Sequence, residues 1–172
     1  MAIRRLDRRP ERKVTRTGAK PPVARLVKRL SEPTVCRRCG AVFARQTWRA
    51  SRTLTHAALA RATWTTCPAC RQAGEGIGYG RVIIRGAYAA EHEREIRRRI
   101  RNVAERAQFT QPERRVVSVD RREGPAVLEV LTTSQKLAHR IVHELKKAFR
   151  GRARYAWSDR DGSLVATWER DR

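Results

Sequence analysis

The four cysteines of this 172-residue chain have the residue type and spacing to do chemistry. Cys36 and Cys39 form one C-x-x-C pair, and Cys67 and Cys70 form a second. Each pair can turn two sulfurs toward one centre, and two such pairs complete a tetrahedral shell of four thiolates. We therefore expect a zinc site with Cys36, Cys39, Cys67 and Cys70 as its ligands. Four sulfurs leave no open coordination position, so this zinc would hold structure and would not catalyse a reaction.

Other uses of the four thiols are less well supported by the pattern. An iron–sulfur centre or separate free thiols are the remaining alternatives to zinc. Two disulfides would suit a small secreted domain, but no secretory segment is visible in the sequence. A redox C-x-x-C motif would not need a second pair. Gly40 after the first pair and Pro68 inside the second suit the tight turns that a metal site needs.

The composition indicates a polyanionic partner. The chain has 40 Lys and Arg residues against 17 Asp and Glu, which gives a net charge of +23. Arg greatly outnumbers Lys, and its planar fork pairs with phosphate at two points and stacks on bases. No apolar run approaches the roughly 20 residues that a membrane span requires. We expect a cytoplasmic protein that binds nucleic acid and does not bind a membrane.

The first part of the chain reads as a basic arm, residues 1–34. It has too few apolar residues to order itself, so we expect disorder, either as a loose tail or as an arm that folds along phosphates when bound. The second interpretation is favoured. The candidate RNA-binding residues lie in this arm and in the cysteine-bearing segment; they are Arg4, Arg5, Arg8, Arg9, Arg12, Lys13, Arg16, Lys20, Arg37, Arg38, Arg45, Arg49 and Arg52.

Residues 35–75 are expected to form the zinc module. A strand is expected within residues 41–49, and a short helix over residues 51–62, capped by Ser51. Trp64 is expected to pack near the metal. The glycine-rich stretch 74–80 is interpreted as a hinge, because it lacks the strand and the Gly-Lys-Ser/Thr sequence of a phosphate-binding loop.

Residues 81–172 are expected to form an α+β domain with the order β-α-β-β-α-β-β. The helices are expected over residues 90–108 and 134–150, each with an apolar stripe at helical spacing. The first six elements match the ferredoxin-like pattern, a sheet with two helices on one face. Tyr155, Trp157 and Trp168 could stack bases on the open face, but packing against the helices is the favoured reading.

Two further features were weighed as sites. His139 and His143 have the four-residue spacing of metal ligands on a helix, but Arg140 stands where the glutamate of an H-E-x-x-H motif would be. A solvated helix face is the favoured reading. No nucleophile elbow or paired carboxylates appear, so we do not expect an enzyme.

The two cysteine motifs and the strand at residues 81–86 resemble the large-subunit export adaptor family, which is named after nonsense-mediated decay. Residues 133–151 and the segment to Trp168 resemble the part of that family that follows its zinc region, so that the resemblance covers roughly residues 33–170. Small bacterial relatives of the family show the same similarity. The larger relatives carry more cysteine pairs and further domains, so their export role is not expected here.

The resemblance implies a zinc protein on the RNA of the large ribosomal subunit, near the tRNA sites. It implies that Cys36, Cys39, Cys67 and Cys70 are the zinc ligands. We therefore expect a monomeric factor that acts by occupying ribosomal RNA, in ribosome hibernation or in subunit maturation. A DNA-binding zinc-ribbon regulator and an RNA-modifying enzyme are the alternatives.

Overall fold

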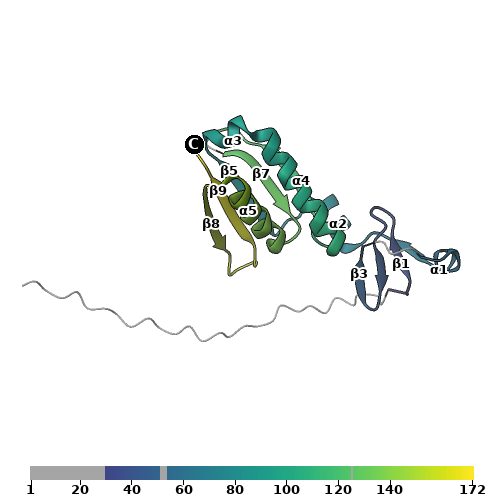
Figure 1. Ribbon diagram of the computed structural model, residues 1–172. Helices are drawn as coiled ribbons and strands as arrows, with labels where there is room; N and C mark the ends of the chain where they lie inside the picture. Colours follow the sequence, from purple (N-terminus) through teal and green to yellow (C-terminus); the bar gives the residue numbers. More distant parts are fainter. Residues whose placement is uncertain (1–29, 51–53, 125) are drawn as a thin grey trace, which may run out of the picture.

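The computed structural model describes residues 30–50, 54–124 and 126–172, which form two sheets with helices (Figure 1). The first sheet surrounds the cysteine pairs and has the order β3-β2-β1-β4. A short helix precedes β4, and a second begins at the second cysteine pair. The elements are β1 (Thr34–Cys36), β2 (Val42–Ala44), β3 (Thr47–Arg49), α1 (His56–Ala60), β4 (Thr63–Thr65) and α2 (Pro68–Gly74).

The second sheet is larger and carries the main core. Its strand order is β6-β7-β5-β9-β8. The predicted α+β class is confirmed, with an additional short helix, α3, before the first long one. The elements are β5 (Gly80–Arg85), α3 (Ala87–Glu91), α4 (Glu93–Thr110), β6 (Val116–Arg121), β7 (Ala126–Thr132), α5 (Gln135–Phe149), β8 (Arg152–Trp157) and β9 (Leu164–Glu169).

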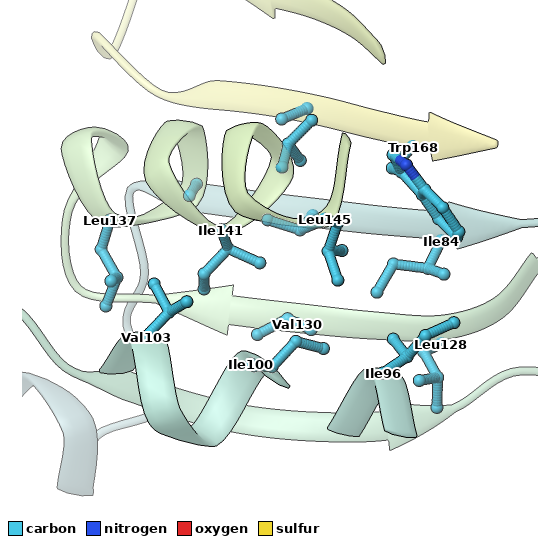
Figure 2. Close-up of a cluster of buried hydrophobic side chains, with 14 of the residues drawn as sticks. Ile84, Ile96, Ile100, Val103, Leu128, Val130, Leu137, Ile141, Leu145 and Trp168 are labelled. Carbon is cyan, nitrogen blue, oxygen red and sulfur yellow. The ribbon is translucent and has the colours of Figure 1, made fainter. Parts of the chain in front are cut away.

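The two long helices form because apolar residues recur at helical spacing. The buried stripe of α4 is Ile96, Ile100, Val103 and Ala107, and α5 buries a stripe that includes Leu137, Ile141 and Leu145. Both stripes pack on the same face of the larger sheet (Figure 2). Ser134 accepts a hydrogen bond from the amide of Leu137, so the predicted cap of α5 is confirmed.

Alternation along the strands decides which side chains enter this core. Val82 and Ile84 of β5, Leu128 and Val130 of β7, and Trp168 of β9 are fully buried toward the helices. The indole of Trp168 also donates a hydrogen bond of 2.7 Å to the carbonyl of Arg150. Trp168 is therefore a core residue, as favoured from the sequence.

The ferredoxin-like strand order is not confirmed. In a split βαβ unit a helix joins two parallel strands that have one strand between them, and β5-α4-β6 has this form, with β7 between. After α5, however, β8 takes the sheet edge, and β9 folds back between β8 and β5. Strand β9 runs parallel to β5 and antiparallel to β8. The hairpin of β8 and β9 therefore occupies the edge of the sheet beside β5, where a ferredoxin-like sheet has a single strand.

The glycine-rich segment is attached to the larger sheet at its C-terminal end. The amide of Tyr79 donates to the carbonyl of Thr132 at 3.0 Å, and the amide of Leu164 donates to the carbonyl of Tyr79 at 2.8 Å. A Cβ at Gly80 would lie 2.4 Å from the hydroxyl oxygen of Thr132, so only glycine fits there. Tyr79 is thus held between β7 and β9, while the predicted boundaries at residues 34, 35, 75 and 81 stay predictions.

Two expectations about the cysteine-bearing half were wrong in detail. The helix between the cysteine pairs is shorter than predicted, because Thr55 and not Ser51 caps it. Trp64 lies in β4 with 45% of its surface exposed, and Trp48 packs against the cysteine cluster in its place. Residue 51 and most of the basic arm lie outside the described residues. The described helices include no candidate membrane span.

Candidate metal centre and basic surface

The structure brings the four cysteine sulfurs together. Cys36 lies at the end of β1, Cys39 in the turn after it, and Cys67 and Cys70 at the start of α2. All four sulfurs lie within 4.8 Å of one another, and those of Cys39 and Cys67 are 3.8 Å apart. Tetrahedral zinc with bonds of about 2.3 Å places its sulfurs about 3.8 Å apart. The quartet therefore has the geometry of a four-thiolate metal site.

Backbone groups hold this arrangement. The amide of Cys67 donates to the sulfur of Cys36 at 3.3 Å, and the amide of Cys70 donates to the sulfur of Cys67 at 3.4 Å. Gly40 has a φ of +69°, which lets its amide turn back to the carbonyl of Cys36 at 2.9 Å. Pro68 takes the first turn of α2, where its missing amide costs no hydrogen bond. Such outer contacts orient metal ligands.

The shifted pKa values of three of the thiols are consistent with a cation among the four sulfurs. Burial raises the pKa of the Cys36 thiol, but the amides of Cys67, Arg38 and Cys39 outweigh burial and bring that pKa down to about 6. Burial raises the pKa of Cys67 to about 11 and also raises the pKa of Cys70. A cation at the centre would stabilise the thiolates that burial disfavours.

Two arginines lie beside the centre. Arg38 donates a hydrogen bond from Nη1 to the carbonyl of Cys70 at 3.3 Å, and the charge of Arg115 lowers the pKa of Cys70 against the stronger effect of burial. A divalent ion with four thiolates leaves an excess of negative charge, which these guanidinium groups would offset. Arg38 was singled out from the sequence for RNA binding, and the structure gives it this second contact.

The remaining candidate RNA-binding residues divide into two groups. Arg37, Arg45 and Arg49 are exposed around the cysteine-bearing half, and no carboxylate of the described residues lies within ion-pair distance of them. The others lie outside the described residues; they are Arg4, Arg5, Arg8, Arg9, Arg12, Lys13, Arg16, Lys20 and Arg52.

A second basic surface lies on the two long helices, and the predicted RNA-binding residues do not include it. The outer sides of α4 and α5, opposite their buried stripes, expose cations at helical spacing, and we call this surface the α4–α5 face. An ion pair of 2.6 Å between Arg99 and Glu144 joins the two helices. In the sequence, the helical spacing of residues 136, 140 and 147 already places three cations on one side of α5. The residues of the α4–α5 face are Arg94, Arg98, Arg101, Lys136, Arg140 and Lys147.

The open face of the larger sheet differs in character. Three of its cations are paired: Arg81 and Arg122 lie within 3.5 Å and 3.0 Å of Glu129, and Arg152 lies 3.8 Å from Glu169. Strand pairing places Tyr155 opposite Ala166 and Trp157 opposite Leu164, on the helix side. The predicted alternative of base stacking by these aromatics on the open face is therefore wrong.

The two helical histidines do not join a metal site. His139 stacks on Tyr155 with ring centroids 4.7 Å apart, and His143 lies 3.9 Å from Glu144. In the described part of the chain the cysteine quartet is the one group of at least three possible metal ligands. The favoured reading of these histidines as surface residues agrees with this arrangement.

No model of a known protein family matches this chain, and no curated protein matches it in sequence.

Proposed function

We propose that the protein is a zinc-containing, RNA-binding factor that works by occupying ribosomal RNA. The observation that carries the proposal is the excess of positive charge, +23 over 172 residues, on a chain that also has a preformed four-thiolate site. Zinc fits the closed tetrahedral sulfur shell, and its binding would supply on the order of 10 kcal/mol to the fold of the first sheet. In this proposal the metal stabilises the fold of the first sheet, and the arginines bind RNA.

The distribution of charge supports RNA as the partner. Cations crowd the α4–α5 face and the rim of the cysteine-bearing half, where Arg37, Arg45 and Arg49 are exposed. Arginine pairs with phosphate through two parallel hydrogen bonds, so these surfaces suit a folded phosphate backbone. The open sheet face, with its paired charges, is left out of the proposed contact.

The ribosome is the proposed site because of the resemblance described above. A factor seated near the tRNA sites of the large subunit would exclude tRNA or mark a stage of assembly. Both roles need tight placement and no chemical step, so we propose that the protein is no enzyme. We also propose that it acts as a monomer in the cytoplasm.

The direct test measures binding of the full chain to purified large-subunit RNA while the salt concentration is varied. Affinity should fall steeply and linearly on logarithmic axes, because each neutralised phosphate releases counterions. Affinity that stays constant between 50 and 200 mM salt, the range over which such complexes weaken by about 10³-fold or more, would contradict the proposal. Sequence-selective binding to duplex DNA would favour a regulator instead.

A further inference from the structure

Three neighbouring hollows follow the junction between the first sheet and the C-terminal end of α4. Their volumes are about 530, 260 and 360 Å³. Ala50 and Phe109 line both the first and the second, and Gln108 and Arg115 line both the second and the third. Because adjacent hollows share walls, they form one groove, which we call the junction groove.

Two aromatic side chains line the first hollow of the junction groove. Phe109 lies in the last turn of α4, outside its buried stripe, and 78% of its surface is exposed. Trp48 of β3 lines the same hollow from the opposite element and packs on its other side against Phe43 and the cysteine cluster. An exposed phenyl ring opposite an anchored indole contributes little to the core and is free to stack on a planar ligand.

Gln111 also lines the first hollow. Its Oε1 is buried and has no hydrogen-bond partner among the described residues, so this oxygen is not open to the hollow.

Three arginines lie along the same groove. Arg49 lines the first hollow, Arg115 the second and third, and Arg38 the third. Arg115 is anchored by a hydrogen bond of 2.9 Å from Nε to the carbonyl of Pro112. Glu105 and Glu113 also line the groove, as do Cys39 and Cys70 of the cysteine quartet, so its charge is mixed.

We propose that the junction groove binds a single-stranded segment of RNA. Unpaired bases would stack on Phe109 and Trp48. Arg38, Arg49 and Arg115 would contact the phosphates on either side. Proteins that bind single strands combine aromatic platforms with a basic groove in this way, whereas bases inside a duplex have no free face to offer.

This inference rests on the proposed RNA binding and assigns paired and unpaired RNA to two different surfaces of the protein. The α4–α5 face carries cations without exposed aromatics among its six residues, which suits the backbone of paired RNA. The junction groove, with Phe109 and Trp48 in its walls, suits bases that are out of a helix. The full chain should therefore bind RNA in which paired and unpaired stretches adjoin.

The test compares the full-length, metal-loaded protein with its Phe109→Ala variant on two labelled RNAs. One is an unstructured strand of ten nucleotides, and the other is a blunt-ended, fully paired duplex. Because Phe109 is exposed, its loss should leave the fold intact. Binding to the single strand should weaken about tenfold, as expected for one lost base stack, and binding to the duplex should not change. Phe109→Tyr, which keeps a stacking ring, should restore the affinity.

Trp157→Ala provides the matched control, since Trp157 is an aromatic with 56% exposure at the far edge of the larger sheet. This control should bind both RNAs like the unchanged protein. If Phe109→Ala binds both RNAs with unchanged affinity, or loses both equally, the groove assignment is overturned while RNA binding stands. If the unchanged protein binds neither RNA, the proposed function itself fails.

Discussion

Gln72 donates a hydrogen bond from Nε2 to the carbonyl oxygen of Thr133 at 2.9 Å. The bond joins α2, which begins at the second cysteine pair, to the residue that links β7 to α5. Contacts between α2 and β6 lie beside it. The metal centre is therefore attached to the larger sheet, and the junction groove lies along this attachment.

The first prediction concerns the metal ligands. Cys67→Ser should release the metal and unfold the first sheet, because this small unit has too little core to fold without it. The second sheet should stay folded, since its core is separate. Metal content and hydrogen exchange measured together would show the loss of protection in β1–β4. His139→Ala, at an exposed helical residue, should change neither, and a folded, metal-loaded Cys67→Ser protein would exclude the ligand assignment.

The second prediction tests the core under α5. Leu145 is fully buried between the helices and the sheet, so Leu145→Ala should lower the free energy of unfolding by about 2–5 kcal/mol. Lys146→Ala, at the exposed neighbour, should stay within about 0.5 kcal/mol of the unchanged protein. Denaturant unfolding measures both. Equal effects of the two substitutions would show that α5 presents a different side to the sheet.

How much of this fold the sequence predicts depends on the kind of signal. The clustering of the four cysteines and the stripes of α4 and α5 follow from local spacing, and the structure shows both. The position of β9 does not, because no local pattern says that Leu164–Glu169 pairs with β5 in parallel. Trp64 and Trp48 lie in similar short strands, so the sequence could not tell which one packs on the cysteines.

Prediction of the candidate site from the sequence is limited in the same way. Helix α2 could have been predicted from Cys67 followed by Pro68, a cap and first-turn pair. Phe109 could have been noticed as an aromatic outside the stripe of α4. The groove itself could not, because it is formed by residues from β3, α4 and the segment before β6, which come together only in the folded chain.

The third prediction concerns the α4–α5 face. Arg140→Ala should weaken RNA binding and reduce the slope of log affinity against log salt by about one, because one phosphate contact is lost. Arg122→Ala is the control, since Arg122 already pairs with Glu129 on the open sheet face. Anisotropy titrations at several salt concentrations give both slopes. A reduced slope for Arg122→Ala alone would place the RNA on the open face.

The fourth prediction concerns pH and the turn between β2 and β3. Arg45 and Gln46 both have positive φ, and their amides donate to the Glu32 carboxylate at 2.9 and 2.8 Å. These bonds hold the pKa of Glu32 below its usual range. The carboxylate therefore stabilises the turn fully above the ordinary pKa of a glutamate, and this stabilisation is lost as the pH falls through the lower folded value.

Nuclear magnetic resonance titration of the Glu32 carboxyl and of the two turn amides would follow this loss. The amide signals of Arg45 and Gln46 should move together with the carboxyl signal. In Glu32→Gln the pH-dependent movement of the amides should vanish. Amides that titrate at the usual glutamate pKa, or that titrate in Glu32→Gln as well, would contradict the role of this carboxylate.

We propose that this arginine-rich protein, stabilised by a metal, acts by binding ribosomal RNA. Sucrose-gradient sedimentation of the tagged full chain, from growing and from starved cells, measures this binding in the cell. The protein should migrate with the large subunit or with whole ribosomes at low salt and leave them at high salt. Migration at the top of the gradient under every condition would show that the protein does not bind ribosomes.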